Sequence, residues 1–308
     1  MANPLGRSVW RHLGVDQRCA QSARRRALLD LGSDSSIVSQ HNLKDSVREF
    51  WDRKSCGEVY ATGSDLREQL ENQARARYAI EPMICPFADY PAGAGKDVLE
   101  IGVGMGADHF EWARANPRSL TGIDITTRAI HFTANRLGLY GLRSDLCIAD
   151  AENLPFPDGS FDIVYAFGVL HHSPNTTRAV QEVHRVLRHG GIAKVLIYHS
   201  RAIVGFMLWL RYGPFAFRPF RPLSDVYAHH LESPGTKAFT VAEGRTLFSS
   251  FSSLDLRIEL GSGDLLNGDV GQRHRGPLLS IAKVIWPRWF IRRALKRYGG
   301  AMFITAVK

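Results

Sequence analysis

Cysteine is scarce in this chain. Only four cysteines occur among the 308 residues, namely Cys19, Cys56, Cys85 and Cys147. No two of them have the spacing of metal ligands, and four in a chain of this length do not make the disulfide framework of a small secreted protein. We therefore expect reduced, mostly buried thiols.

Long apolar runs and an export signal are also missing. The apolar runs are too short to cross a bilayer, and six arginines interrupt the first 30 residues, where a secretion signal would be apolar. No recognised RNA-binding or DNA-binding module is present. We expect a cytoplasmic protein without a nucleic-acid partner, built as one large domain or as one domain with additions.

Acidic residues are absent from the last 33 positions, 276–308, which carry seven lysines and arginines. The formal net charge is +9, which favours an anionic partner. Residues 289–297 predict a helix with a basic and an apolar face. Together with Trp286 and Trp289, such a helix is also typical of peripheral membrane contact through 286–297. Of the two interpretations we favour a packed helix whose basic face is solvated.

A glycine-rich turn is the most informative feature that is present. An apolar run over 98–101 ends in Gly102-Val103-Gly104-Met105-Gly106, and a second run ends at Asp124, 22 residues after the first glycine. This is how a βαβ unit builds a nucleotide pocket. Gly102, Gly104 and Ala107 also satisfy the dinucleotide pattern, so the glycines alone leave two cofactor classes open.

Later motifs separate these classes. Glu100 precedes the glycines within the first strand, and Ala149-Asp150-Ala151-Glu152 leads into a Pro155-Phe156-Pro157-Asp158-Gly159 loop. Residues 164–172 follow, ending in His171-His172, and then 185–191. This series resembles the class I S-adenosylmethionine-dependent methyltransferases, in the branch with quinone and small-molecule enzymes. The resemblance covers roughly residues 75–200 and implies S-adenosylmethionine as cofactor.

The resemblance also implies a fold. We expect an α/β, doubly wound, mostly parallel seven-stranded sheet with an antiparallel C-terminal edge strand and helical lid insertions. Period-two alternation over 253–260 and 301–307 predicts strands six and seven. We divide the chain into a weakly ordered basic extension over 1–40, an N-terminal helical lid over 41–82, and a methyltransferase domain over 83–308. Insertions are expected at 200–240 and 261–298.

Several residues take cofactor roles by this resemblance. Glu100 holds the ammonium end, Asp124 the ribose hydroxyls, and Asp150 the adenine amino group, with Ala151 supplying a backbone N–H. The remaining predicted cofactor residues are Gly102, Val103, Gly104, Gly106, Ile125, Glu152, Phe167 and Gly168.

The chemistry needs few protein groups, because the cofactor is already activated. His171 or His172, just beyond strand four, is predicted to act as general base, and the alternative is that the pair packs against the cofactor. We expect Tyr198 and His199, at the end of strand five, to line the acceptor pocket. Tyr60 and Tyr78 of the lid and the pair His229-His230 are further candidates. Glu232 follows that pair without an established ligand spacing, so we expect no metal.

These observations predict methyl transfer to a small-molecule or lipid-like acceptor by in-line attack on the sulfonium methyl. The acceptor itself, which is anionic, aromatic or lipid-like, cannot be identified from these residues, and neither can the oligomeric state. Two alternatives remain: an NAD(P)-dependent oxidoreductase, and a non-catalytic membrane-binding or partner-binding module on the same fold.

Overall fold

The computed structural model describes residues 35–267 and 283–308. Most of the expected basic extension over 1–40 and part of the expected insertion over 261–298 lie outside these residues. Within the described ranges, none of the helices has both the length and the apolar character needed to span a bilayer.

Seven strands form one sheet in the order β3-β2-β1-β4-β5-β7-β6. Strands β1 to β5 pair in parallel, and β7 is antiparallel to both β5 and β6. The predicted mixed, mostly parallel sheet is therefore confirmed, and β6 forms the edge beside the antiparallel β7. The strands are β1 Asp97–Ile101, β2 Ser119–Asp124, β3 Asp145–Ile148, β4 Phe161–Phe167, β5 Leu187–Tyr198, β6 Ser253–Glu259 and β7 Ala301–Val307.

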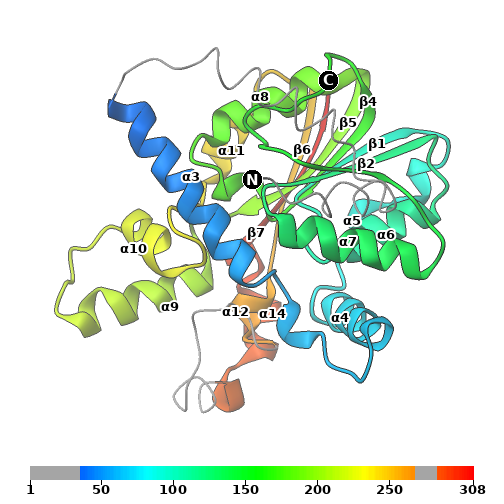
Figure 1. Cartoon of the computed structure of the whole chain (residues 1–308). Coiled ribbons are helices and arrows are strands. Elements are labelled where there is room, and N and C mark those ends of the chain that lie inside the picture. The colour runs from blue at the N-terminus through cyan, green and yellow to red at the C-terminus, as the bar shows by residue number, and fades with distance from the viewer. Residues whose placement is uncertain (1–34, 268–282) are drawn as a thin grey trace, which may run out of the picture.

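Helices cover both faces of this sheet (Figure 1). Because side chains alternate along a strand, Val98 of β1 packs with α5 and α6 on one face, and Leu99 packs with α8 on the other. α7 joins the α6 face through Ile130 and Ala134. The helices of this body are α5 Ile84–Ala88, α6 Ala107–Arg114, α7 Thr127–Leu139, α8 Thr176–Val186 and α11 Val241–Leu247, with short 3₁₀ turns at η2 Tyr90–Gly93 and η3 Leu170–His172.

Two helices before the sheet lie over its carboxyl edge. The first is α3 Ser35–Arg53, and the short turn η1 Glu58–Tyr60 follows it. The second, α4 Leu66–Ile80, begins after Asp65, because the Asp65 side chain accepts the backbone N–H of Glu68 at 2.9 Å as an N-cap. Figure 1 shows α3 crossing in front of the sheet.

Helical segments also follow β5 and β6. The first insertion contains α9 Ile203–Tyr212, η4 Pro214–Ala216 and α10 Leu223–His230, and the second contains α12 Ser262–Leu265, α14 Arg288–Ala294 and η5 Lys296–Tyr298. The expected continuous helix over 289–297 is wrong, because α14 ends at Ala294 and the chain tightens into η5. Ile291 is buried but Phe290 is half exposed, so the predicted apolar face is only partly covered.

Two of the cysteines depart from the expectation of mostly buried thiols. Cys56 and Cys85 are free and exposed, whereas Cys147 is buried in β3.

Candidate functional site

The glycine-rich turn after β1 forms the floor of a cavity of about 220 Å³. Gly102 has φ +81°, and a Cβ added there would lie 2.2 Å from the Val169 side chain, so no other residue fits. Gly104 also has a positive φ and lines the cavity, and a Cβ there would meet no protein atom within 4 Å. The turn therefore leaves a cradle at the carboxyl end of β1 that side chains would fill.

Asp124 at the end of β2 faces this cradle. Its Oδ1 accepts the Thr126 backbone N–H at 2.9 Å and the Thr126 hydroxyl at 2.8 Å, and its Oδ2 accepts the Gly104 N–H at 3.2 Å. Burial raises the pKa of Asp124, and these donors oppose that rise. Thr126 is the N-cap of α7, so Asp124 does not cap that helix and its carboxylate faces the cavity beside Ile125.

Asp150 and Ala151 line the next part of the cavity, after β3. Lys44 of α3 reaches across to Asp150 Oδ2 at 2.6 Å and to Glu152 Oε2 at 2.7 Å. Burial lowers the pKa of Lys44, but the two carboxylates outweigh it and leave the pKa raised. Glu152 also accepts the Asn175 backbone N–H at 2.7 Å. Glu152 lies outside the cavity lining and therefore not where a cofactor contact is expected. Its carboxylate binds Lys44 and the backbone N–H of Asn175, between η3 and α8, instead.

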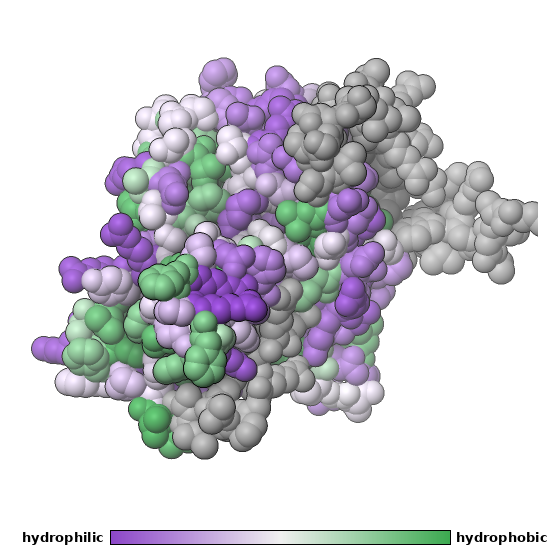
Figure 2. Space-filling model, turned by 90° about the vertical axis from the view of Figure 1, so that its left-hand side faces the viewer, coloured by the Kyte–Doolittle hydropathy of each residue, from purple (hydrophilic) through white to green (hydrophobic). Residues whose placement is uncertain are grey.

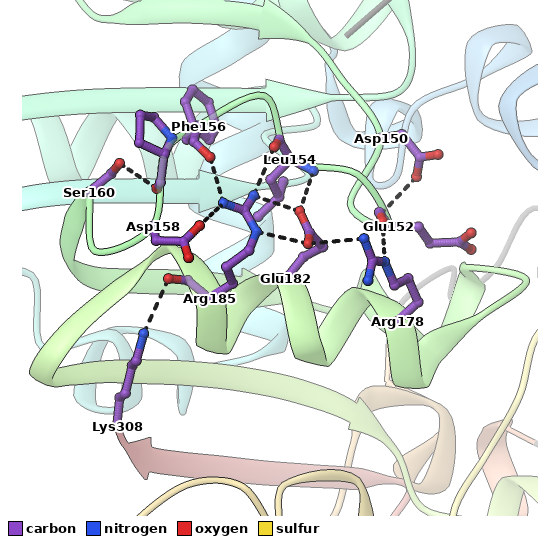
Figure 3. Close-up of polar contacts among 11 residues, drawn as sticks. Asp150, Glu152, Leu154, Phe156, Asp158, Ser160, Arg178, Glu182, Arg185 and Lys308 are labelled. Carbon is purple, nitrogen blue, oxygen red and sulfur yellow. Dashed lines mark hydrogen bonds and ion pairs between the residues drawn. The ribbon is translucent and has the colours of Figure 1, made fainter. Parts of the chain in front are cut away.

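The loop after Ala151 is fixed from behind by α8 (Figure 3). Arg185 donates to the backbone carbonyls of Leu154 and Phe156 at 3.0 and 2.8 Å. Glu182 accepts the Leu154 N–H at 2.9 Å and pairs with Arg185. These bonds satisfy the backbone of a proline-rich loop that has no ladder partners, and they hold Asp150 in position.

Charged residues gather at the other end of the cradle. Arg77 of α4 forms a bidentate pair with Asp108 at 2.7 and 3.0 Å, and Tyr78 and Tyr165 also donate to that carboxylate. Arg77 also lies over the ring of Phe167, at 5.1 Å. Phe167, Gly168 and Val103, which are predicted cofactor residues, line the cavity, whereas Gly106 lies beneath it against Thr133.

Glu100 is buried at this end and lines the cavity. Its Oε2 lies 2.9 Å from His109 Nδ1. Burial and the nearby Asp108 raise the pKa of Glu100 well above its ordinary value, and burial lowers the pKa of His109 to about 3. A cationic group bound here would favour the ionised carboxylate.

The two predicted base histidines have different surroundings. His172 lines the cavity, and its Nδ1 lies 2.9 Å from Ser233 Oγ and 3.1 Å from Thr236 Oγ1. His171 lies behind it with its ring 4.2 Å from the His172 ring and 3.9 Å from the Tyr198 ring. Burial lowers the pKa of His171 well below its ordinary value. His171 is outside the cavity lining, so only His172 can meet a substrate directly.

A further compartment of about 140 Å³ adjoins the cavity. The residues that line both are Trp51, Ser55, Cys56, Gln73, Arg77, Glu81, Tyr198 and Glu232. Those that line only the further compartment are Phe50, Lys54, Gly57, Glu58, Val59, Tyr60, Ile80 and Ser262. We call these residues the acceptor compartment. The Tyr198 hydroxyl donates to Glu232 Oε2 at 2.7 Å, and the same oxygen lies 3.4 Å from His172 Nε2.

Other predicted pocket residues lie elsewhere. Tyr78 is committed to Asp108, and His199 donates from Nδ1 to the Gly299 carbonyl at 2.9 Å, behind β5. His229 is exposed beside Asp225, and His230 stacks on Tyr212 at 3.7 Å. None of the four lines either cavity. α10 ends at His230, so both histidines stay on that helix while Glu232 turns inward.

Sequence reasoning missed Lys44, Arg77, Asp108 and Glu232 as site residues. Asp108 lies in the first turn of α6, directly after the glycine motif, which is a local signal. The other three are brought to the site by long-range folding. Imidazole and carboxylate atoms of His171, His172 and Glu232 lie within 4.8 Å of one another, so among the described residues this is where a metal ion could bind.

Comparisons with known proteins agree with this geometry. Residues 99–195 match the family described as "Methyltransferase domain". The chain is 37% identical over 149 residues to 27-O-demethylrifamycin SV methyltransferase of Amycolatopsis mediterranei, which is 44% of this chain and 55% of the relative. It is 40% identical over 98 residues to fatty-acid O-methyltransferase of Mycolicibacterium smegmatis, which is 32% of this chain and 35% of that relative. The chain thus spans about half the length of these relatives, or less.

A solved structure shares the fold. Phospholethanolamine N-methyltransferase 2 of Haemonchus contortus, in complex with phosphomonomethylethanolamine and S-adenosylhomocysteine, superposes with a TM-score of 0.55 at 17% identity. The match covers 85% of this chain and 60% of that chain. Residues 99–195 therefore resemble a methyltransferase domain, and the sheet order and the cradle beside Asp124 agree with that match.

Proposed function

We propose that this protein transfers the methyl group of S-adenosylmethionine to a hydroxyl group of a small-molecule or lipid-like acceptor. The observation that carries the proposal is the continuity of two cavities. The first has the glycine cradle, Asp124 and Asp150, and the second has the aromatic and carboxylate side chains of the acceptor compartment. His172 and Glu232 lie where they meet.

The residues of the first cavity fit the cofactor. Asp124 would accept the ribose hydroxyls, Asp150 the adenine amino group, and Glu100 would face the ammonium group. Gly104 leaves the space that a ribose and sulfonium need, because a Cβ there would project into the cavity. When bound, the cofactor supplies an electrophilic methyl group, and the protein has only to hold and deprotonate the acceptor.

His172 is the residue we propose as general base. The Thr236 hydroxyl donates to the Ser233 carbonyl at 2.6 Å and can therefore accept from His172 Nδ1, and we propose the tautomer in which Nδ1 carries the proton. His172 Nε2 then holds a free lone pair, and this atom forms no hydrogen bond within the described residues. Once Nε2 takes a proton, Glu232 stabilises the imidazolium at 3.4 Å.

The charges of the acceptor compartment select the acceptor group. Three carboxylates line it, those of Glu58, Glu81 and Glu232, beside the cations Lys54 and Arg77. Arg77 is already paired with Asp108, and Glu58 with Arg128. Burial raises the pKa of Glu81, which shows how poorly this compartment solvates negative charge. An alcohol can donate to these carboxylates, whereas a carboxylate acceptor would be repelled. One relative is named for a fatty acid and another for an O-demethylated compound; the compartment favours the second chemistry.

The net charge suggests an anionic acceptor, but the +9 charge belongs to the whole chain. The acceptor meets a lining with three carboxylates, those of Glu58, Glu81 and Glu232, and two cations, Lys54 and Arg77. We also propose that residues 41–82, which contain α4 and most of α3, form the cover over both cavities. Residues 83–308 form the catalytic domain with its insertions at 200–240 and 261–298.

Two measurements test the proposal. Calorimetry with S-adenosylhomocysteine should show binding, with NAD as the control for the oxidoreductase alternative. Transfer of a labelled methyl group to a fatty alcohol and to the fatty acid of equal chain length should favour the alcohol at least about tenfold. If EDTA leaves the rate of methyl transfer unchanged, the result favours base catalysis over a metal ion bound at His171, His172 and Glu232. Binding of NAD instead would overturn the methyl-transfer proposal, and a faster acid would overturn only the acceptor class.

A further inference from the structure

Four phenylalanines are exposed in the segment after β5. Phe206 on α9 is 57% exposed, and Phe215, Phe217 and Phe220 are 77, 96 and 95% exposed. Single exposed apolar residues are ordinary, but four large aromatic side chains within 15 residues are not. Phe217 even has φ +58°, a left-handed conformation that costs energy for a bulky residue. Phe206 stacks on Trp209 with ring centroids 6.0 Å apart, and the other three rings project outward.

The charges around these rings have one sign. Residues 200–224 contain Arg201, Arg211, Arg218 and Arg221 and no acidic residue. Arg221 pairs with Asp225, whereas the other three are exposed. Figure 2 views the side of the molecule on which α9 and α10 lie in Figure 1, and hydrophobic and strongly hydrophilic side chains lie next to one another in the lower part of that face.

The second insertion repeats the combination. Val284, Ile285 and Trp289 are 83, 74 and 75% exposed. Arg292 and Arg293 of α14 and Lys296 and Arg297 of η5 are also exposed. No acidic residue occurs over 283–308.

α12 joins the two segments. Asp264 accepts the Val204 N–H of α9 at 3.0 Å through its side chain and the Trp286 indole N–H at 2.8 Å through its carbonyl. Arg288 donates to the Leu265 carbonyl at 2.9 Å. Ser262 of the same helix lines the acceptor compartment. Both exposed segments are therefore fastened to an element that borders the place where we expect the acceptor to bind.

We propose that residues 201–221 and 284–297 form one surface that docks on an anionic lipid bilayer. Aromatic rings enter the interface between headgroups and acyl chains, and the arginines and lysines pair with anionic headgroups. Because neither segment carries an acidic residue, the charge of both segments is complementary to that of an anionic bilayer. The link to the acceptor rests on the proposed function: a lipid-like acceptor would pass from the bilayer to the compartment beside α12.

Vesicle sedimentation of the full chain without cofactor tests this proposal. We expect binding to phosphatidylcholine vesicles that contain about 30% phosphatidylglycerol, and much weaker binding to phosphatidylcholine alone. The double change F217S/F220S should weaken binding at least about tenfold, since both rings are almost fully exposed and the fold does not need them. The change R292E/R293E should have a comparable, salt-dependent effect.

The matched charge control is R114E/R143E, which changes net charge equally on α6 and before β3, at the opposite edge of the sheet from β6. Equal weakening by this control would overturn the localised surface in favour of net charge alone. No vesicle binding would overturn the proposal. The proposal would also be overturned if the chain formed a dimer in the absence of vesicles and F217S/F220S made it monomeric, because the surface would then bind a second copy of the chain. Calorimetry with S-adenosylhomocysteine on the same variants reports separately on the proposed function.

Discussion

The two halves of the cavity are built in different ways. The cofactor half comes from consecutive strand ends, with the Gly102 turn after β1, Asp124 after β2 and Asp150 after β3. The acceptor half takes Trp51 from α3, Glu81 from the end of α4, Tyr198 from β5 and Glu232 from the first insertion. The cofactor half is formed by the strand ends of the sheet itself. The acceptor half depends on helices and an insertion that pack against the sheet. Substitutions should therefore separate binding of the cofactor from turnover.

The largest effect is expected in the acceptor half. His172→Ala should lower the rate of methyl transfer about 10²–10⁴-fold, because the general base is lost. Binding of S-adenosylhomocysteine should stay within about twofold of the parent value, as measured by calorimetry. His229→Ala, which removes an exposed histidine of the same type, is the control and should leave the rate unchanged. Equal loss in both variants would remove His172 from its role.

Asp124→Ala tests the cofactor half. It removes a carboxylate that would accept two ribose hydroxyls, so the affinity for S-adenosylhomocysteine should fall about 100-fold. Calorimetric titration measures this loss. Asp255→Ala, an exposed aspartate on β6, should bind like the parent. Retained affinity in Asp124→Ala would show that the cradle binds another ligand.

Glu232→Gln sharpens the contrast within the acceptor half. The amide keeps the bond from Tyr198 but no longer stabilises a cationic His172, so the rate should fall about tenfold with little change in KM for an alcohol. A fatty-acid acceptor should gain relative to the alcohol, because one negative charge is removed from the compartment. A KM effect without a rate effect would make Glu232 a packing residue only.

Glu81→Gln should change stability and, as for Glu232→Gln, shift the preference from the alcohol toward the fatty acid, with little change in the rate for the alcohol. Burial raises the pKa of Glu81, so the folded state holds its proton more tightly than the unfolded state does. Stability is therefore lost as pH rises above the unfolded pKa, and the amide removes that loss. Thermal unfolding should give a melting temperature a few degrees higher than the parent at pH 8, with no difference at pH 4. A lower melting temperature at pH 8 would mean that the contact with Arg77 dominates.

Lys44→Met is expected to have the smallest effect. The ion pairs with Asp150 and Glu152 are partly exposed, so their loss should cost about 1 kcal/mol. Hydrogen exchange should become faster in α3 and stay unchanged in α8. Slower exchange in α3 would show that Lys44 does not hold the cover down.

The contrast also explains what the sequence could predict. Gly102, Asp124 and Asp150 each follow an apolar run directly, so local pattern and strand order are enough to assemble them. Lys44 and Glu232 reach the site only after α3 and the first insertion fold back over the sheet, and no periodicity records that contact. The prediction chose His229-His230 and missed Glu232, two residues later, because the end of α10 decides which side chains turn inward. His171 was indistinguishable from His172 for the same reason.

The position of β7 has a consequence for synthesis of the chain. β6 has no partner in the sheet except β7, and β7 is made only after the whole second insertion. Until then β6 and the open side of β5 present unpaired backbone groups, which is a template for pairing with other chains. Completion of the sheet therefore waits for the pairing of β5 with β7, the two neighbouring strands that are farthest apart in the sequence. Slow translation through the second insertion would lengthen the period in which a newly made chain can aggregate.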